Sequence, residues 1–338
     1  MQQKKLLMIS TDRKIFQEGS AVRARQAEYA KGWAEVHILV FDDARSLNGE
    51  TVIAPNCWAY PIQSRAKILH PFGTMKLGKF LVVKRGITDV TCQDPFLTAM
   101  AGIGLKKDFP QVRLEMQVHS DIGSTYFTYS FGNKIRKSLA LSYLPKADHV
   151  RVVSGKIRDF LVEKLGTPDS KIEVRPIFVD TEKIKTAPVI ETADLRKKYP
   201  QFGKIVLVAS RLEKEKNVAL AISSWKKITE KAPSAGLVIV GSGSELATLK
   251  SMVTDLGLNT TVVFEGWADQ ATLYSYYKTV DVFVNTSLFE GYGMTLVEAH
   301  AAGCPIVSTD VGVAKEVGAI IAAWDESDVA DKVASVLV

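Results

Sequence analysis

The sequence has few cysteines, and their arrangement excludes two kinds of stabilised site. Only Cys57, Cys92 and Cys304 occur, with no C-x-x-C pair, so we expect neither a disulfide framework nor a cysteine zinc site, and a reducing cytoplasm fits. Long apolar runs are also missing, since none approaches the ~18 residues of a membrane-spanning helix. The N-terminus has an apolar stretch of only four residues, too short for a signal peptide. Any membrane association should therefore be peripheral.

Acidic residues are missing from two stretches of the first half. None occurs in 51–88, which has six basic residues, and none occurs in 122–147, where basic residues alternate with Tyr and Phe. Residues 1–180 carry 27 basic and 18 acidic side chains, a net charge of +9, whereas residues 181–338 have a net charge of −3. Such a surface suits an anionic membrane or a nucleic acid, and equally a solvated basic face. The composition leaves these three alternatives open.

Apolar runs rich in Val and Ile alternate with helix-like segments along the whole chain. The runs have little polar alternation, which is typical of parallel strands buried on both faces. We expect strands at 4–10, 35–41, 87–93, 112–119, 147–153, 171–179, 203–210, 235–241, 260–266, 281–287, 305–310 and 317–323. Helical segments between them include 21–33, 216–231, 245–256 and 270–279. This alternation predicts an α/β fold with doubly wound, Rossmann-like sheets.

The length of 338 residues suggests about two domains. Polar residues and two prolines interrupt the alternation between residues 180 and 200. We therefore predict an N-terminal domain at 1–180, a linker at 181–200 and a C-terminal domain at 201–338.

The segment 287–305, SLFEGYGMTLVEAHAAGCP, is the most informative part of the chain. It joins two strand-like runs through a glycine-rich turn and a short helix rich in small residues. Gly291 and Gly293 let the backbone bend and approach a ligand closely. Glu290 before the turn and Glu298 within the helix are two carboxylates that could hold sugar hydroxyls. The amides at the start of the helix would point outward and favour a phosphate, and they belong to Met294, Thr295 and Leu296.

Charged and glycine-rich loops follow the preceding strands. Arg211 and Lys216 follow the strand 203–210, at the sheet edge where open α/β folds bind ligands. Two cations there could clamp a diphosphate, Arg through bidentate bonds, and an ordinary charged loop is an equal alternative. Gly241 opens the turn GSGSE, but Leu246 stands where a dinucleotide fingerprint needs its third glycine. This difference argues against a dehydrogenase.

These motifs, in this order, resemble the retaining glycosyltransferases of the GT-B fold, in particular family 4 of nucleotide-sugar enzymes. The segment 287–305 resembles the family's E-x7-E signature. The run ASRLEKEKN is similar to its R-x4-K diphosphate motif, and GSGSE is similar to its G-x-G-x-E turn. The resemblance extends from about residue 4 to residue 335, and it implies two Rossmann-like domains that face each other across a cleft.

The resemblance also implies roles for single residues. Glu290 would orient the donor sugar, Glu298 would bind the ribose, and Arg211 and Lys216 would meet the charge of the diphosphate. His119 ends a strand, as does a family histidine near the transferred sugar, and with Glu290, Arg211 and Lys216 it forms the predicted catalytic set. The other donor-side candidates are Gly19, Gly241, Trp267, Gly291, Tyr292, Gly293, Met294, Thr295 and Leu296. The candidates on the acceptor side are Asp94 and Asp121.

The expected reaction is transfer of a hexose from a UDP- or GDP-linked sugar to a glycan or lipid-linked acceptor. The chain has no D-x-D triplet, the usual metal-diphosphate motif of the other main glycosyltransferase fold, so we expect no metal and no cofactor. We expect no nucleic-acid partner, and a cytoplasmic location that includes the inner face of the plasma membrane. Family members usually continue with further terminal helices, which we expect to be missing after Val338. The alternatives are a non-catalytic sugar-nucleotide-binding scaffold and a GT-B nucleotide-sugar epimerase.

Overall fold

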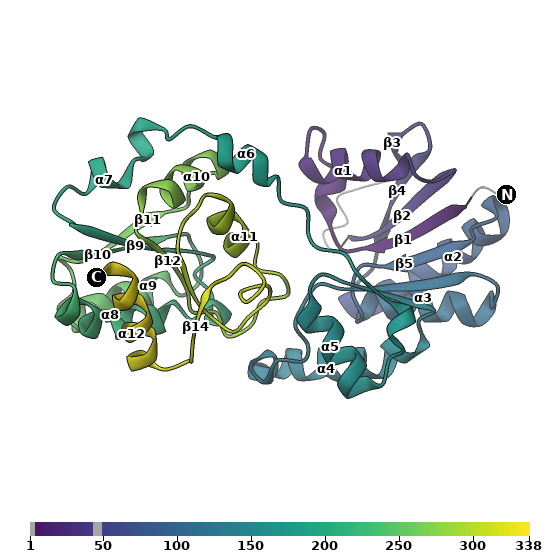
Figure 1. Ribbon diagram of the computed structural model, residues 1–338. Helices are drawn as coiled ribbons and strands as arrows, with labels where there is room; N and C mark the ends of the chain where they lie inside the picture. The colour runs from purple at the N-terminus through teal and green to yellow at the C-terminus, as the bar shows by residue number, and fades with distance from the viewer. Residues whose placement is uncertain (1–3, 43–48) are drawn as a thin grey trace. The chain divides into compact units, whose positions relative to one another are not determined.

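The computed structural model describes residues 4–42 and 49–338. The chain divides into two compact units, Met1–Arg175 and Pro176–Val338, each an α/β sheet with helices on its faces (Figure 1). The division lies close to the boundary expected at residue 180.

The N-terminal unit contains an eight-stranded sheet with the order β3-β4-β2-β1-β5-β6-β7-β8. Its strands are β1 (Lys5–Ser10), β2 (Glu35–Asp42), β3 (Thr51–Ala54), β4 (Cys57–Gln63), β5 (Asp89–Cys92), β6 (Arg113–Val118), β7 (His149–Val152) and β8 (Ile172–Val174). Its α-helices are α1 (Ala21–Ala30), α2 (His70–Arg85), α3 (Leu97–Asp108), α4 (Phe131–Tyr143) and α5 (Gly155–Leu165). All neighbouring strands are parallel except the edge pair β3–β4, which is antiparallel.

The edge pair β3–β4 is the part of this sheet that the sequence did not predict. Its strands include Pro61 and are separated by Pro55, so they lack a continuous Val- and Ile-rich run. Pro61 lies beyond Ala59, the last residue of β4 that pairs with the edge strand β3, so the side of the backbone that faces β3 makes no ladder bond there and tolerates proline. The six strands expected in this unit are all present.

The C-terminal unit contains a six-stranded parallel sheet with the order β11-β10-β9-β12-β13-β14. Its strands are β9 (Lys204–Ala209), β10 (Ala235–Val240), β11 (Val262–Gly266), β12 (Val282–Asn285), β13 (Ile306–Thr309) and β14 (Ile320–Ala322). Its α-helices are α6 (Thr181–Thr186), α7 (Leu195–Lys198), α8 (Val218–Lys231), α9 (Leu246–Asp255), α10 (Gln270–Thr279), α11 (Met294–Ala301) and α12 (Glu326–Leu337). This is the 3-2-1-4-5-6 strand order of the Rossmann fold, as predicted.

The helices of the C-terminal unit cover the two faces of its sheet. One apolar core joins the sheet to α8, α9 and α12, and a second joins its other face to α6, α7, α10 and α11 (Figure 1). The chain changes faces between β9 and β12, which are adjacent in the sheet. The loops after these two strands therefore diverge, and such a switch point leaves a crevice at the carboxyl edge where ligands bind.

The segment 181–200 is part of the C-terminal unit and not the linker that its polar composition suggested. Ile184, Ala193 and Leu195 are buried in the core with α10 and α11. Glu265 on β11 fixes the end of the segment, because it accepts hydrogen bonds from Lys198 at 2.6 Å and from Tyr199. Three apolar side chains are enough to hold the segment, while its polar residues face solvent.

Candidate donor-binding site

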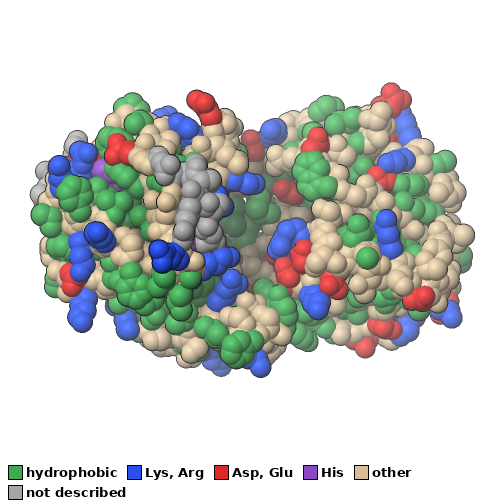
Figure 2. All heavy atoms as spheres, turned by 180° about the vertical axis from the view of Figure 1, so that it is seen from behind, with side chains coloured by type: hydrophobic (Ala, Val, Ile, Leu, Met, Phe, Trp, Pro, Cys, Tyr) green, Lys and Arg blue, Asp and Glu red, His purple; other side chains and the backbone are tan. Residues whose placement is uncertain are grey.

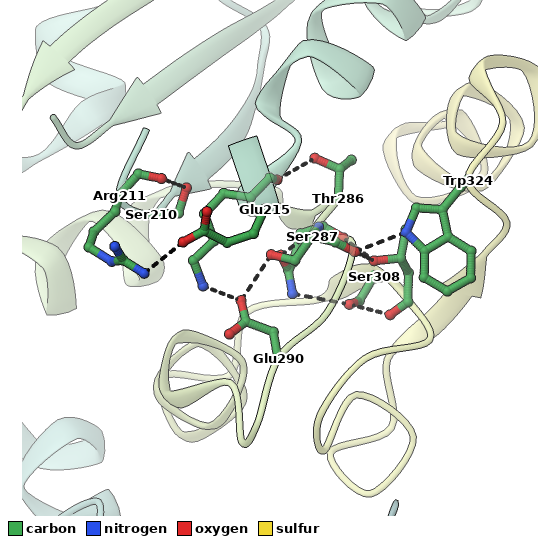
Figure 3. Close-up of polar contacts among 11 residues, drawn as sticks. Ser210, Arg211, Glu215, Thr286, Ser287, Glu290, Ser308 and Trp324 are labelled. Atoms are coloured by element: carbon green, nitrogen blue, oxygen red, sulfur yellow. Dashed lines mark hydrogen bonds and ion pairs between the residues drawn. The ribbon is translucent and has the colours of Figure 1, made fainter. Parts of the chain in front are cut away.

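The switch point of the C-terminal sheet brings together two residues predicted separately. The Nζ atom of Lys216, after β9, lies 2.6 Å from Oε1 of Glu290, after β12. The hydroxyl of Ser287 also lies 2.9 Å from this carboxylate oxygen (Figure 3) and 2.6 Å from Oδ1 of Asn285, so its single proton is shared between these two acceptors. The side chains of Lys216 and Glu290 are only 15% and 14% exposed. A cation and an anion thus share one half-buried position at the edge where a nucleotide sugar is expected.

Backbone contacts between the two loops fix this pair. Asn217 follows Lys216 with a left-handed φ of 48°, a conformation that Asn tolerates better than most residues. Its carbonyl accepts a hydrogen bond from the Thr286 hydroxyl at 2.9 Å, and the Leu288 amide donates to the Glu215 carbonyl at 2.8 Å. The loop after β9 is therefore tied to the loop after β12 on both sides of the ion pair.

Arg211 occupies a more open position than Lys216. Its side chain is 69% exposed and pairs with Glu215 at 2.9 Å (Figure 3). It lies beside a pocket of about 160 Å³ that Gly241, Trp267 and Thr295 also line. Whole-ligand pockets usually measure roughly 300–1,000 Å³, so this one suits a part of a ligand such as a base. Trp267 is 74% exposed at its rim, as a residue that stacks on a base would be.

The glycines of the turn after β10 are required by packing between loops. Gly241 has a φ of +137°, and a Cβ atom there would lie 1.8 Å from the Ser210 carbonyl oxygen. A Cβ atom at Gly243 would lie 2.3 Å from the Leu212 carbonyl oxygen. Both glycines therefore let this turn lie against the loop that carries Arg211, which explains the motif without any ligand.

Helix α11 begins directly after the glycine-rich turn, as predicted. Gly293 precedes it with a φ of +90°, and the amides of Met294 and Thr295 have no partner within the helix. The Leu296 amide differs from the prediction, because it donates to the Gly293 carbonyl at 3.0 Å. The Leu296 side chain is fully buried. The first helical turn thus offers two outward amides where the sequence suggested three.

The loop after β13 packs against the glycine-rich turn. The Val313 amide donates to the Tyr292 carbonyl at 2.9 Å. A Cβ atom at Gly312, whose φ is +50°, would lie 2.2 Å from the same carbonyl oxygen. Gly312 therefore provides the close approach between the two loops. The half-buried Gly291 lies in the same turn.

Glu298 lies on the buried side of α11. It is 6% exposed, and the Tyr277 hydroxyl lies 3.4 Å from its Oε2 atom. Burial raises the pKa of Glu298 above its ordinary value, and the hydrogen bond from Tyr277 opposes this effect. The carboxylate predicted to bind a ribose is thus almost enclosed by the second core of the C-terminal unit.

The aspartates predicted on the acceptor side form local turns in the N-terminal unit. Asp121 is buried, and its Oδ1 atom accepts hydrogen bonds from the amides of Gly123 and Ser124 at 3.1 and 3.0 Å. Burial raises the pKa of Asp121. Oδ1 of Asp94 accepts from the Phe96 amide at 2.8 Å, before α3. These bonds give both residues a structural role, and an acceptor role stays a prediction.

The other two candidates of this unit lie at loops. His119 directly follows β6 and is exposed, and its Nε2 atom lies 3.0 Å from Oε1 of Gln117. Gly19 is also exposed, in the turn before α1, with a φ of +75°, and a Cβ atom there would meet nothing within 4 Å. The backbone conformation, not packing, therefore requires glycine there.

Ser287 is the residue of this site that sequence reasoning missed. Besides its hydroxyl bond to Glu290, its carbonyl accepts from the Thr309 hydroxyl at 2.7 Å and from Trp324 Nε1 at 3.0 Å (Figure 3). It therefore connects Glu290 to the end of β13 and to the loop after β14. A serine three residues before a candidate glutamate, at the end of a buried strand, was the only signal in the sequence.

Among the residues that the structure describes, one group has the proximity of metal ligands. Glu115, His149 and Glu173, on β6 to β8 of the N-terminal unit, have ligand atoms within 4.8 Å of one another. His149 Nδ1 lies 3.2 Å from Glu115, and Arg175 pairs with Glu173 at 2.7 Å. Glu115 and Glu173 therefore both have protein partners without a metal ion.

Two family matches and several known proteins identify the relatives of this chain. Residues 27–183 match Glycosyltransferase Family 4, and residues 192–337 match Glycosyl transferases group 1. An uncharacterized glycosyltransferase of Methanocaldococcus jannaschii is 30% identical over 255 residues, which are 72% of this chain and 62% of the relative. The GDP-mannose-dependent alpha-(1-6)-phosphatidylinositol monomannoside mannosyltransferase of Mycobacterium tuberculosis is 31% identical over 206 residues, 56% of this chain and 53% of the relative.

A solved structure supports the same assignment at the level of the fold. Sucrose-phosphate synthase of Thermosynechococcus elongatus has a TM-score of 0.79 and 19% identity, over 99% of this chain and 90% of its own. The matches to the two curated relatives span less than two thirds of the length of each. Together, the two family matches and the two Rossmann-like units show that the chain belongs to the GT-B glycosyltransferases of family 4, group 1.

Proposed function

We propose that this protein is a retaining glycosyltransferase that moves a hexose from a UDP- or GDP-linked sugar to a glycan or lipid-linked acceptor. The observation that carries the proposal is the half-buried pair of Lys216 and Glu290 at the switch point of the C-terminal sheet. The cation can pair with the charge of a diphosphate, and the carboxylate can orient a reacting sugar. The pair offers both at the edge where the fold binds ligands.

The neighbouring groups suit the rest of a nucleotide sugar. The amides of Met294 and Thr295 and the guanidinium of Arg211 would oppose the charge that develops on the leaving diphosphate. The small pocket beside Trp267 suits the base. Glycosyl transfer passes through an oxocarbenium-like state, which the Glu290 carboxylate would stabilise electrostatically. The mycobacterial relative, which is GDP-mannose-dependent, favours a nucleotide-diphosphate donor of this kind.

The direct test is binding followed by turnover. Calorimetry with UDP and GDP should give a measurable affinity for one of them, and the corresponding nucleotide sugars should then release nucleoside diphosphate. Binding without turnover would favour the scaffold alternative. Recovery of an epimerised nucleotide sugar, with no release of nucleoside diphosphate, would favour an epimerase.

Turnover is expected to continue in excess EDTA. In enzymes that bind the diphosphate through a metal ion, carboxylates hold that ion. Here the cations Lys216 and Arg211 and the amides at the start of α11 would bind the diphosphate directly, so chelation should leave the rate unchanged. We propose on the same ground that no cofactor is needed. A rate that falls on chelation and returns with Mg²⁺ or Mn²⁺ would contradict this prediction.

Replacement of Glu298 by Gln should weaken nucleotide binding by about tenfold or more, the cost of one charge-assisted hydrogen bond to the ribose. The matched control is Tyr277→Phe, which removes the protein's hydrogen bond to Glu298 but keeps the carboxylate. Calorimetry should give weaker binding for Glu298→Gln only. Equal affinities in the wild type and in Glu298→Gln would leave Glu298 a purely structural role.

The same substitution should stabilise the ligand-free protein. Because burial raises the pKa of Glu298 above its ordinary value of 4.5, the folded state loses stability as the pH rises above 4.5 and the carboxylate ionises. Gln carries no such cost. Thermal unfolding should therefore give a higher Tm for Glu298→Gln at pH 7, and this gain should shrink toward pH 4.5.

The acceptor side of the proposal includes an anionic membrane surface. Phe72, Phe80 and Val83 are 55%, 54% and 74% exposed on α2, and at this spacing they share one helix face with Lys76 and Lys84. Figure 2 shows hydrophobic and basic side chains side by side over the N-terminal unit, on the left of that view. Basic and aromatic residues on one face suit binding in the plane of a membrane. No helix among the described residues is long and apolar enough to span one.

Vesicle co-sedimentation tests this surface. The protein should pellet with phosphatidylglycerol vesicles at low salt, and less so as salt rises or with phosphatidylcholine. Replacing Lys76 and Lys84 by Gln should weaken binding about 30-fold, at ~1 kcal/mol for each basic residue. Lys79 is a poorer target because it pairs with Asp108 at 2.5 Å.

The control variant carries the same change of charge on the C-terminal unit, with Lys226 and Lys250 replaced by Gln. It should pellet as the wild type does. Equal loss of binding in both variants would mean that net charge, and not the α2 surface, governs sedimentation. No difference between the two lipids would favour a glycan acceptor in solution.

A further inference from the structure

A chain of hydrogen bonds crosses one face of the N-terminal sheet and ends at His119. Nδ1 of His149 lies 3.2 Å from Oε2 of Glu115, and the Thr91 hydroxyl donates to Oε1 of Glu115 at 2.8 Å. The amide nitrogen of Gln117 donates to the Thr91 hydroxyl at 2.9 Å, and the carbonyl oxygen of Gln117 lies 3.0 Å from Nε2 of His119. These side chains come from the adjacent strands β5, β6 and β7.

The chemistry of the groups fixes the direction of every bond. A carboxylate only accepts, so the Thr91 hydroxyl must spend its single proton on Glu115. Thr91 can then only accept from Gln117, which turns the NH₂ of the Gln117 amide toward Thr91 and its carbonyl toward His119. A carbonyl cannot donate, so Nε2 of His119 must carry the proton.

Burial makes this arrangement hard to reverse. Thr91 and Gln117 are each 2% exposed, and a buried polar group without a partner is costly. A flipped Gln117 amide would set its carbonyl against a hydroxyl that has no proton left to give. The exposed His119 ring is thus oriented by an enclosed network that reaches to Glu115.

We propose that Gln117 is a positioning residue that holds His119 with its proton on Nε2, so that Nδ1 accepts a hydrogen bond from a hydroxyl of the substrate. His119 follows β6 at the carboxyl edge of the sheet, where α/β folds bind ligands. The identity of the hydroxyl as that of a sugar rests on the proposed function. The position of the proton on Nε2 does not depend on the proposed function.

The charge state of the ring agrees with this role. Partial desolvation of His119 and, after it, the positive charge of Arg151 lower the pKa of His119 below its ordinary value, so the imidazole is neutral at pH 7. A neutral ring with its proton on Nε2 has its lone pair on Nδ1.

Nitrogen–proton correlation NMR of the imidazole rings tests the proposal on the intact chain at pH 7. The chain has five histidines, and the signals lost in His119→Asn assign His119. The wild type should show a protonated Nε2 and a lone-pair Nδ1. Gln117→Leu removes the acceptor, and Thr91→Val removes the anchor of the amide without touching the ring. Both should shift the two nitrogen signals of His119 toward each other as the tautomers mix.

One control separates this effect from a general disturbance. Thr74→Val makes the same change as Thr91→Val at another buried threonine, whose hydroxyl has no partner, and should leave the His119 signals unchanged. A proton on Nδ1 in the wild type, or wild-type signals in both Gln117→Leu and Thr91→Val, would overturn the proposal.

A kinetic measurement adds the consequence for function. With a donor that the wild type turns over, Gln117→Leu should lower kcat by about 10–100-fold, because a functional group displaced by about 1 Å can cost about 100-fold in rate. Its affinity for nucleoside diphosphate should not change, because the C-terminal unit binds it. If the wild type turns over no donor, the proposed function fails, while the NMR result still decides the role of Gln117.

Discussion

Exchange of Glu290 for Gln is expected to lower kcat by about 10²–10³-fold, the usual cost of removing one preorganised electrostatic group from a reacting centre. Gln keeps the size of the side chain and an oxygen for the Ser287 hydroxyl, which lies 2.9 Å from the carboxylate. It loses the negative charge that would face the oxocarbenium-like sugar. Steady-state release of nucleoside diphosphate, with donor and acceptor saturating, measures the effect.

Affinity for nucleoside diphosphate should stay constant or rise in this variant. Glu290 neutralises Lys216 at 2.6 Å in the ligand-free protein, so its loss frees the cation for the diphosphate. Glu230→Gln, an exposed glutamate on α8, is the control and should behave as the wild type. Weaker nucleotide binding at unchanged kcat would instead mean that Glu290 acts mainly by positioning Lys216.

The sheets of this protein could be predicted from sequence because parallel strands buried on both faces give continuous apolar runs. All twelve expected strands are present. The edge pair β3–β4 escaped because its residues are partly exposed and interrupted by proline. The segment 181–200 was assigned to a linker because most of its residues are polar and face solvent. Its position depends instead on a few buried apolar side chains, such as Ile184 and Leu195, which have little effect on the composition.

The site was only partly predictable, because motif spacing locates loops but does not say which side chains meet. Lys216 and Glu290 are 74 positions apart, and only the strand order β9-β12 makes them neighbours. Glu298 lies on the buried side of α11. The eight positions from Glu290 to Glu298 include the glycine-rich turn as well as part of the helix, so their spacing alone does not say which helix face carries Glu298. The network from Glu115 to His119 was invisible for the same reason, since it crosses three strands that are distant in sequence.

Replacement of Lys216 by Met is expected to weaken the binding of nucleoside diphosphate by about 10–150-fold. This range corresponds to the 1.5–3 kcal/mol of one charge-assisted hydrogen bond. Met keeps much of the apolar stem in a position that is only 15% exposed, so the fold should survive. Arg211→Met should cost less, because Arg211 is 69% exposed and already pairs with Glu215, and solvent screens such contacts. Calorimetry with the preferred nucleoside diphosphate gives both values.

The double variant Lys216→Met with Glu290→Gln distinguishes loss of the cation from exposure of the anion. In Lys216→Met alone, Glu290 keeps its negative charge beside the diphosphate and repels it. Removing that charge as well should restore part of the lost affinity, so the two substitutions should not be additive, as is usual for residues in contact. Additive effects would mean that Glu290 lies away from the bound diphosphate. Unchanged affinity in Lys216→Met would remove Lys216 from the diphosphate site, and with it the observation on which the proposed function rests.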